Sequence, residues 1–246
     1  MSSLPVFFAE QLPCEGGETT LDGPEGRHAA TVRRLRAGEG LVLTDGCGEL
    51  AVCEVLDTGR DRLELKALRR ESEPAPVLRV TLAQALIKGP RGELAVELAT
   101  EAGVDAVLPW RADRCVARWD DGLRGAKALS HWRQAAREAA KQSRRARFPQ
   151  VAEPVDTTVL GQRCAAAAGC LVLHESAAEP LPMVTLPAAG ELLLVVGPEG
   201  GITDFELATL AAAGGRPVRL GREVLRSSSA GAVALGAINA LSRRWD

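Results

Sequence analysis

The stretch that decides the fold is ELLLVVGPEGGIT, residues 191–203. Residues 192–196 are a continuous apolar run, which is typical of a strand buried on both faces of a parallel sheet covered by helices. A glycine-rich turn follows. Thr203 and Glu206 have the spacing of a capping box, which predicts that a helix begins there. Strand, turn and helix together predict a βα loop that faces a ligand.

The turn itself, residues 197–201, contains three glycines, which allow positive φ angles and let a ligand lie against bare main chain. It lacks the Gly-Lys-Ser/Thr of a Walker loop and the G-x-G-x-x-G spacing of a dinucleotide fingerprint. Glu199 would repel an anion, so a neutral or cationic ligand fits better than a phosphate. Taken alone, however, the turn is better explained as an ordinary tight turn.

A second stretch, residues 218–230, reads VRLGREVLRSSSA and combines a short strand, a glycine and a serine-rich entry to the last helix. Together the two stretches resemble the C-terminal signature of the SPOUT methyltransferases, which fold into a trefoil knot and bind S-adenosylmethionine. The resemblance is strongest to the family that methylates N3 of a uridine in 16S ribosomal RNA. That family carries a GPEGG loop and then an LG…LR segment at about this separation.

The resemblance implies that three loops, after Leu173, Val196 and Leu220, enclose the cofactor. The residues expected to bind it are Leu173, His174, Glu175, Gly197, Pro198, Glu199, Gly200, Gly201, Leu220, Gly221, Val224, Leu225, Arg226 and Ser227. For His174 and Glu175, an acid–base role and the ordinary polar end of a strand remain equally open.

The chemistry suggests roles for two of these residues. Uracil N3 carries a proton at neutral pH and is a poor nucleophile until that proton leaves. A positioned base and a cation that stabilises the uracil anion would therefore help. Arg226 is our hypothesis for the cation and Glu199 a weaker hypothesis for the base. Many relatives have a glutamate and a threonine where this chain has Ser228 and Ser229, so no catalytic carboxylate is available at that position.

Length and composition bound the remaining possibilities. The 246 residues suffice for two modest domains or one large one, and 46% are apolar, which supports a real core. No run of about 18 apolar residues predicts a membrane span, and the first residues do not resemble a signal peptide. The six cysteines form no Cys-x-x-Cys pair, so we expect reduced thiols, no metal site and a cytoplasmic protein. The net charge of −2 confines any RNA contact to local patches.

Residues 1–72 are predicted to form a small β-rich domain. Short strands are expected at 6–8, 40–46, 50–55 and 62–67, separated by turn signals that suggest a small barrel. The resemblance implies a PUA-like barrel that helps to dock RNA. Residues 69–76, with two prolines and alternating charge, are the best linker candidate, so the second domain is expected to span 73–246.

Residues 26–36 in the first domain are expected to form a short helix and a turn. They carry Arg27, Arg33, Arg34 and Arg36 and no acid. A solvated face is the usual explanation of such a run, but the resemblance favours RNA contact. His28 within it is as easily structural as functional.

From residue 77 onward, β and α patterns alternate. Strands are expected at 77–86, 104–110, 170–173, 192–196 and 217–220, and helices at 94–102, 130–145, 157–168, 204–213 and 228–242. This order predicts an α/β domain with a mostly parallel sheet whose ligands lie at the carboxyl ends of the strands. The family is matched closely by residues 100–104. Arg114 stands where the family has an Arg-Ser pair, and in this chain Cys115 replaces the serine.

The helix at 130–145 carries the strongest basic signal, because residues 133–147 contain six basic side chains and one acid, Glu138. The stripe is either the solvent-exposed face of a helix or a surface that binds phosphate groups. The excess of basic over acidic residues favours RNA binding. Glu138 is then expected to be a structural partner of the arginines. The full set predicted to bind RNA is Arg27, Arg33, Arg34, Arg36, Arg114, Arg133, Arg137, Lys141, Gln142, Arg144 and Arg145.

The last helix is rich in alanine and glycine, which suits close packing against another backbone. In the resembled fold it lines the knot and the interface of a homodimer. The resemblance therefore implies an S-adenosylmethionine-dependent methyltransferase that acts on N3 of a uridine in the 16S rRNA of the small ribosomal subunit. A ribose 2′-O-methyltransferase of the same fold and a non-catalytic RNA-binding assembly factor are the alternatives, although intact GPEGG and LG…LR loops argue against the latter.

Overall fold

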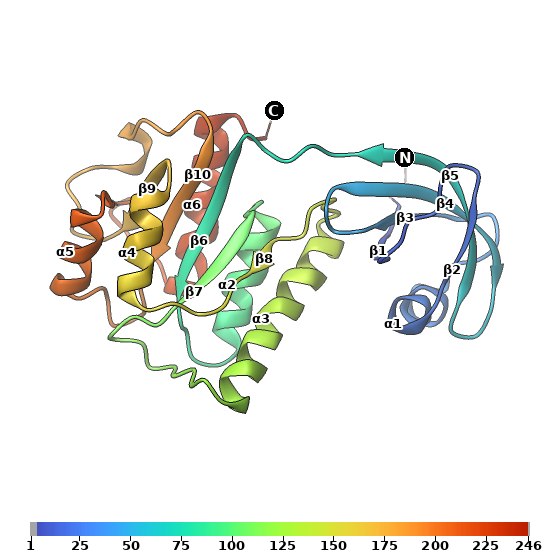
Figure 1. Ribbon diagram of the computed structural model, residues 1–246, viewed down its shortest axis with the longest axis horizontal. Coiled ribbons are helices and arrows are strands. Elements are labelled where there is room, and N and C mark those ends of the chain that lie inside the picture. Colours follow the sequence, from blue (N-terminus) through green and yellow to red (C-terminus); the bar gives the residue numbers. More distant parts are fainter. Residues whose placement is uncertain (1–3, 246) are drawn as a thin grey trace. The chain divides into compact units, whose positions relative to one another are not determined.

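The computed structural model describes residues 4–245, which form two compact units (Figure 1). The first contains the chain up to Ala75 together with Ala140–Phe148. The second contains Pro76–Ala139 and the chain from Pro149 onward. No helix among the described residues is long and apolar enough to cross a membrane.

The first unit is built on a five-stranded sheet with the order β1-β3-β4-β5-β2. Its strands are β1 (Val6–Phe8), β2 (Glu18–Leu21), β3 (Gly40–Thr44), β4 (Glu49–Thr58) and β5 (Leu63–Ser72). β1 pairs with β3 in parallel, and the other pairs are antiparallel. Apolar residues alternate along the strands, so that Leu41, Leu43, Leu63 and Leu65 are buried in one core. The predicted β-rich character is thereby confirmed, and only β2 was not expected.

Two expectations for this unit need correction. The helix starts earlier than predicted, as α1 (Gly23–Arg27), and continues as one turn of π-helix, η1 (His28–Val32). His28 packs edge-on against Phe7, with ring centroids 5.8 Å apart, which is a structural role. The predicted linker at 69–76 is partly strand, because β5 continues to Ser72 in a ladder with β4.

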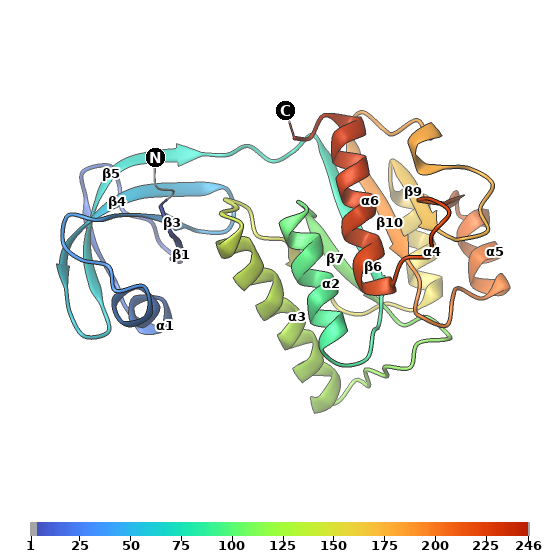
Figure 2. The same cartoon turned by 180° about the vertical axis from the view of Figure 1, so that it is seen from behind.

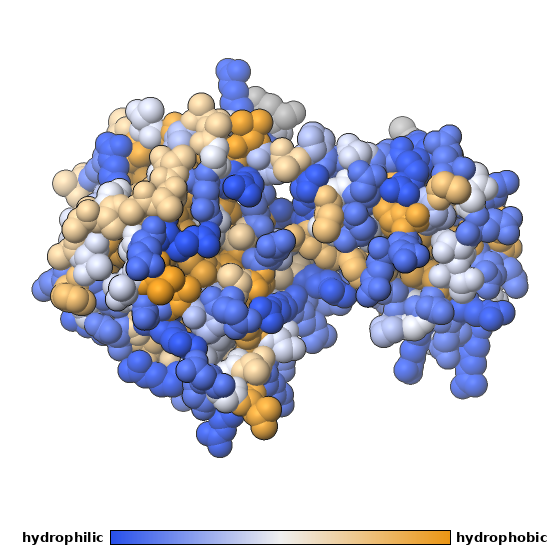
Figure 3. Space-filling model, viewed as in Figure 1, coloured by the Kyte–Doolittle hydropathy of each residue, from blue (hydrophilic) through white to orange (hydrophobic). Residues whose placement is uncertain are grey.

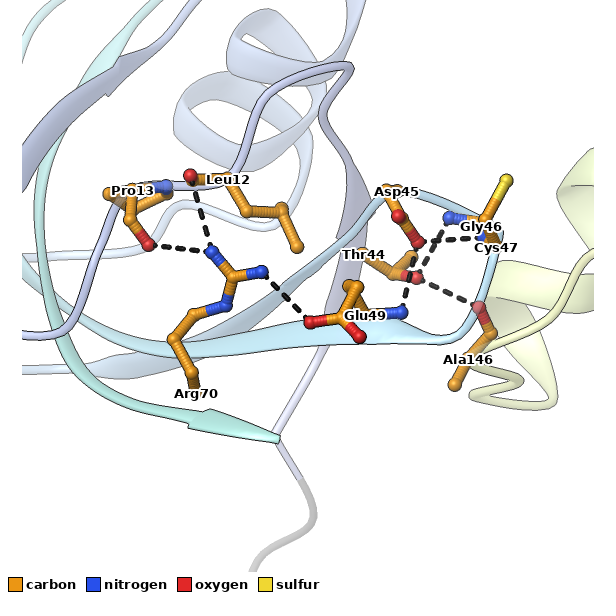
Figure 4. Close-up of polar contacts among 9 residues, drawn as sticks. All are labelled: Leu12, Pro13, Thr44, Asp45, Gly46, Cys47, Glu49, Arg70 and Ala146. Atoms are coloured by element: carbon orange, nitrogen blue, oxygen red, sulfur yellow. Dashed lines mark hydrogen bonds and ion pairs between the residues drawn. The ribbon is translucent and has the colours of Figure 1, made fainter. Parts of the chain in front are cut away.

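The segment 140–148, which includes the last turn of α3 (Leu123–Gln142), belongs to the first unit through buried polar contacts. The Thr44 hydroxyl donates to the carbonyl of Ala146 at 3.1 Å (Figure 4). Lys141 Nζ lies 2.6 Å from Glu25 Oε1, and their side chains are only 8% and 19% exposed. These contacts join residues about a hundred positions apart in the sequence.

Arg70 ties the start of the chain to β4 and β5. Its guanidinium donates to the carbonyls of Leu12 and Pro13, at 3.3 and 3.0 Å, and forms an ion pair with Glu49 at 3.0 Å (Figure 4). Hydrogen bonds from Ser72 and Arg70 lower the pKa of the Glu49 carboxyl from its ordinary value. The carboxylate form of Glu49 is therefore the one that the folded unit favours.

The second unit is a six-stranded sheet with the order β11-β9-β10-β6-β7-β8, in which every strand pair is parallel. The strands are β6 (Leu78–Ala85), β7 (Ala106–Trp110), β8 (Gln150–Val151), β9 (Gly169–Leu173), β10 (Gly190–Val196) and β11 (Arg216–Val218). The helices are α2 (Pro90–Glu101), α3, α4 (Thr157–Ala166), a short 3-10 turn η2 (Leu181–Met183), α5 (Asp204–Ala212) and α6 (Ser227–Ser242). Helix α4 covers the face seen in Figure 1, whereas α2 and α6 cover the opposite face, seen in Figure 2.

Strand β10, which contains the apolar run of residues 192–196, lies at the centre of this unit. Residues 192–195 of β10 are fully buried between β9 and β6. The capping box of Thr203 and Glu206 is present at the start of α5, as predicted. The long basic helix is displaced from its predicted position, because α3 begins at Leu123 and ends at Gln142, shortly before Arg144 adopts a left-handed φ of 59°.

Candidate active site

A cavity of about 500 Å³ opens at the carboxyl ends of β9, β10 and β11. The residues that line it are Arg114, Leu173, His174, Glu175, Val196, Gly197, Pro198, Glu199, Gly200, Gly201, Ile202, Arg219, Leu220, Gly221, Glu223, Val224, Leu225, Arg226, Ser227 and Ala230. Every residue predicted to bind the cofactor lies on this wall, although binding itself stays a prediction. Sequence reasoning did not include Val196, Ile202, Arg219, Glu223 or Ala230.

The glycine turn after β10 is shaped by its own packing. A side chain at Gly197 would place its Cβ 2.6 Å from Ile202 Cγ1, so this position needs glycine. Gly201 has a φ of 77° and donates its N–H to the carbonyl of Pro198 at 2.9 Å, which closes a tight turn. The turn therefore presents main-chain groups to the cavity.

A buried hydrogen-bond chain joins this turn to the first residue of α6 and to β6. Ser227 Oγ donates to the carbonyl of Gly197 at 2.6 Å and accepts from Gln84 Nε2 at 3.1 Å. Gln84 is fully buried at the end of β6, in register with Val196 of β10. Its Oε1 has no hydrogen-bond partner among the residues that the structure describes. The chain holds two walls of the cavity together, and Gln84 was not predicted.

Glu206 anchors the other side of the turn. Its carboxylate is fully buried and accepts from the N–H and hydroxyl of Thr203, at 2.9 and 2.8 Å. The second oxygen accepts from the Asp113 N–H at 2.8 Å and the Thr157 hydroxyl at 3.2 Å. One carboxylate thus links the starts of α4 and α5 to the loop after β7, where sequence analysis expected only a helix cap.

The cavity wall carries charges of both signs. Three acids, Glu175, Glu199 and Glu223, lie on it with three arginines. Arg219 is held by the carbonyls of Ala177, at 2.8 Å, and Ala178, which is a structural role. Arg226 and Glu199, the two proposed catalytic residues, are both exposed on the wall.

His174 has a local partner. Its Nδ1 lies 2.9 Å from the hydroxyl of Ser176, two residues along the same turn. This contact favours the interpretation of His174 as the polar end of a strand.

The first unit carries part of the predicted RNA surface. Arg27, Arg33, Arg34 and Arg36 are all exposed. The turn between β4 and β5 lies beside them, because the Thr31 hydroxyl donates to the Arg60 carbonyl and the Thr58 hydroxyl to the Leu35 carbonyl, both at 3.1 Å. This turn adds Arg60 and Arg62. Figure 3 shows a mostly hydrophilic surface over α1, and we name these six residues the barrel arginines.

The basic stripe of α3 is less uniform than its sequence suggests. Arg133 donates to the carbonyl of Val151 at 3.2 Å and pairs with Glu153 at 2.9 Å. Lys141 is buried in its pair with Glu25 and is not accessible to RNA. The helical repeat shows that these basic residues share one face of α3. At the last turn of the helix, residues of the first unit cover that face. Arg137, Gln142 and Arg144 are exposed, and Arg145 is half-buried.

The cysteines are all free. Cys14 and Cys47 are exposed, whereas Cys53, Cys115, Cys164 and Cys170 are buried. Burial raises the pKa of the Cys53 thiol to about 11. Within residues 4–245, no group of three or more histidine, cysteine, aspartate or glutamate side chains is arranged to hold a metal ion.

Comparison with known proteins gives consistent results over the whole chain. A family model described as an RNA methyltransferase domain matches residues 73–239, and one described as an RNA methyltransferase PUA domain matches residues 21–68. The ribosomal RNA small subunit methyltransferase E of Mycobacterium bovis is 54% identical, over 98% of this chain and 93% of its own length. The protein of the same name from Bacillus subtilis is 30% identical, over 95% and 94%. Among solved structures, that enzyme from Neisseria gonorrhoeae, bound to S-adenosyl methionine, has a TM-score of 0.87 at 27% identity, covering 97% of this chain and 98% of that one.

Proposed function

The chain belongs to the ribosomal RNA small subunit methyltransferase E family, and on that premise we propose that it transfers a methyl group from S-adenosylmethionine to N3 of a uridine in 16S rRNA. Its fold is that of the SPOUT methyltransferases with an N-terminal PUA-like domain. The observation that carries the proposal is that the two family motifs, far apart in the sequence, meet on one cavity at the carboxyl ends of parallel strands.

The cavity suits the methyl donor. S-adenosylmethionine supplies an electrophilic methyl group on a positively charged sulfur. A volume of about 500 Å³ lies within the usual range for small-molecule sites. Main-chain groups at Leu173, Leu220 and Leu225, and those of Gly197 and Gly201 that do not serve the turn's own hydrogen bonds, are proposed to read an adenine edge. The positive sulfur is proposed to lie near the acids, although three arginines on the same wall match them in number.

Two side chains are proposed to act on the acceptor. Arg226, directly before α6, would stabilise negative charge on the uracil, and Glu199 would accept the N3 proton. Both are exposed on the wall of the cavity, where an acceptor base can reach them. A positioned base contributes roughly 10²- to 10⁴-fold to such a step.

RNA docking is proposed for residues 1–72 together with the basic face of α3, and chemistry for residues 73–246; the PUA and methyltransferase family models support this division. The barrel arginines and the exposed basic residues of α3 are the proposed phosphate contacts, without Lys141. Such contacts are strong at low salt and weaken steeply as salt rises.

We also propose a homodimer formed through α6 and a cytoplasmic location, where ribosomal subunits are its substrates. Helix α6 supports the dimer because Val233 and Leu241 are 49% and 48% exposed beside many alanines. Apolar side chains exposed on a helix of small residues are suited to close packing against a second copy.

The test is methyl transfer from labelled S-adenosylmethionine into small ribosomal subunits that lack their native marks, followed by nucleoside mass spectrometry. We expect 3-methyluridine. A ribose-methylated product would favour the 2′-O alternative. No transfer and no cofactor binding would favour an assembly factor. The same assay with Arg226→Ala and Glu199→Gln proteins tests their roles, since a variant at full rate removes that residue from the mechanism.

A further inference from the structure

Arg114 differs from every other residue on the cavity wall in its origin. The other lining residues lie in the three proposed cofactor loops after β9, β10 and β11, at the ends of β9 and β10, or in the first turn of α6. Arg114 comes from the loop after β7, 59 positions before Leu173, the next lining residue in the chain. It is therefore the one described lining residue that comes neither from the three loops nor from the strands and helix that adjoin them, and it is exposed.

The backbone at Arg114 is fixed on both sides. The preceding N–H, of Asp113, donates to the buried carboxylate of Glu206 at 2.8 Å. The following residue, Cys115, is buried and donates its N–H to the carbonyl of Ala112 at 3.1 Å. The side chain therefore projects toward the cavity from a backbone position that is held in place.

Arg114 also packs directly on the glycine turn. Its Nη1 donates to the carbonyl of Gly200 at 3.1 Å. A Cβ at Gly200 would lie 3.1 Å from Arg114 Cβ, tighter than ordinary contact. The close approach of the arginine thus accounts for a glycine at this position of the turn, and it makes Arg114 part of the site.

The guanidinium is not neutralised by a described ion pair. The charged groups on the same wall are Glu175, Glu199, Glu223, Arg219 and Arg226. None of the ion pairs found among residues 4–245 includes Arg114, whose recorded bond is to a neutral carbonyl. Four of its five N–H groups are left for a ligand.

The geometry points to the methyl acceptor as that ligand, and this inference rests on the function proposed above. We propose that Arg114 donates hydrogen bonds to a carbonyl oxygen of the target uracil and stabilises the negative charge that develops as N3 loses its proton. The N3 proton passes to Glu199 and then to water. The N3 electron pair forms the new bond to the methyl carbon, while the pair of the broken carbon–sulfur bond stays on sulfur. A rigid, planar cation suits charge shared between N3 and a neighbouring oxygen.

The experiment compares Arg114→Gln with Arg118→Gln. Arg118 lies in the same loop, is exposed and donates to the Asp113 carbonyl at 3.3 Å, but it does not line the cavity. Both variants lose one positive charge. Single-turnover methylation of unmethylated small subunits is followed from pH 6.5 to 9.5 with saturating donor, and donor affinity is measured separately by calorimetry.

We expect Arg114→Gln to lower the rate by about 10²-fold near neutral pH, as for loss of one group that stabilises an oxyanion. The deficit should shrink as pH rises, because the uracil then ionises without help, and Arg114→Lys should retain part of the rate. Donor affinity should match that of the unsubstituted protein, and Arg118→Gln should keep both properties.

Three results would overturn the inference. These are a full rate for Arg114→Gln, a deficit that is constant with pH, or a loss of donor affinity as large as the loss of rate. The last would make Arg114 a residue that positions the cofactor loop. If the unsubstituted protein makes no 3-methyluridine, the proposed function fails instead, so the two failures are distinguishable.

Discussion

The hydroxyl of Ser227 donates to the carbonyl of Gly197 at 2.6 Å, which joins the first residue of α6 to the glycine turn after β10. Gln84 Nε2 donates to the same hydroxyl at 3.1 Å, so the serine is donor and acceptor at once. The two family motifs are thus linked by a bond inside the protein as well as by their shared cavity. The bond fixes the distance between two of the three cavity loops.

We predict that Ser227→Ala weakens binding of S-adenosylmethionine about five- to tenfold. The substitution removes the partner of the Gly197 carbonyl and of one Gln84 N–H, while Gln84 Nε2 keeps its bond to the Ala85 carbonyl at 3.2 Å. We expect about 1–1.4 kcal/mol of the cost of these unmet buried partners to appear in the binding free energy, which corresponds to about five- to tenfold in affinity. Isothermal titration calorimetry measures the change. Ser229→Ala is the control, since that hydroxyl donates only to the nearby Arg226 carbonyl, at 3.2 Å. Unchanged affinity in Ser227→Ala would show that the bond does not shape the site.

How much of this site could be predicted depends on how local each contact is. The cofactor loops are short stretches in which strand, glycine and helix cap lie together, and every residue predicted from them lies on the cavity. The contacts that hold the loops are long-range. Gln84 meets Ser227 across 143 residues, and Arg114 meets Gly200 across 86. No local periodicity encodes such a pairing, because it depends on strand order.

The same reasoning explains the error at Lys141. A repeat of basic residues every three or four positions shows that they share a face of α3, but it does not show what covers that face. At the last turn the first unit covers it, and Lys141 pairs with Glu25. Arg60 and Arg62 were missed for the converse reason, since they lie in a hairpin turn distant in sequence from residues 27–36 and join those arginines only in the folded unit.

Glu206→Gln is predicted to destabilise the second unit by about 2–4 kcal/mol, because an amide places donors against the N–H and hydroxyl groups that now donate to the carboxylate. Tryptophan fluorescence during urea unfolding reports this unit specifically, since all four tryptophans lie in it. Asp204→Asn is the control, as an exposed acid in the first turn of the same helix, with an expected cost below about 1 kcal/mol. Equal effects would mean that charge near the helix start, not the buried network, accounts for the loss.

Lys141→Met is predicted to destabilise the first unit by about 3 kcal/mol. The Glu25 carboxylate is mostly buried, and the substitution removes the cation that pairs with it. Hydrogen exchange of the β3 and β4 amides measures this directly. A Glu25→Gln, Lys141→Met double variant should recover part of the loss, since it no longer contains an isolated charge. If exchange is unaffected by Lys141→Met, the pair is not a structural element.

The rate of thiol alkylation should distinguish the exposed cysteines of the first unit from the buried one. Burial raises the pKa of Cys53 to about 11, so at pH 8 only about one thiol in 10³ is ionised. Iodoacetamide at pH 8 is therefore expected to label the exposed Cys14 and Cys47 and to spare Cys53, as read by peptide mass spectrometry. Labelling of Cys53 should increase as pH rises toward its pKa. Labelling of Cys53 as fast as Cys47 would indicate that the core of this unit opens readily.

Arg60→Ala is predicted to weaken RNA binding without changing the stability of the first unit. The Thr31 hydroxyl donates to the main-chain carbonyl of Arg60. Truncating the Arg60 side chain therefore does not remove the hydrogen bond that holds the turn. Loss of one phosphate contact should lower the slope of log affinity against log salt by about 0.7 to 0.9. Filter binding to 16S rRNA over a range of salt concentrations measures it. Lys66→Ala is the control, because it removes an equal charge from an exposed position on β5 that is not one of the barrel arginines. If both variants change the slope equally, binding follows the overall charge of the unit; if neither changes it, the barrel arginines are only a solvated face.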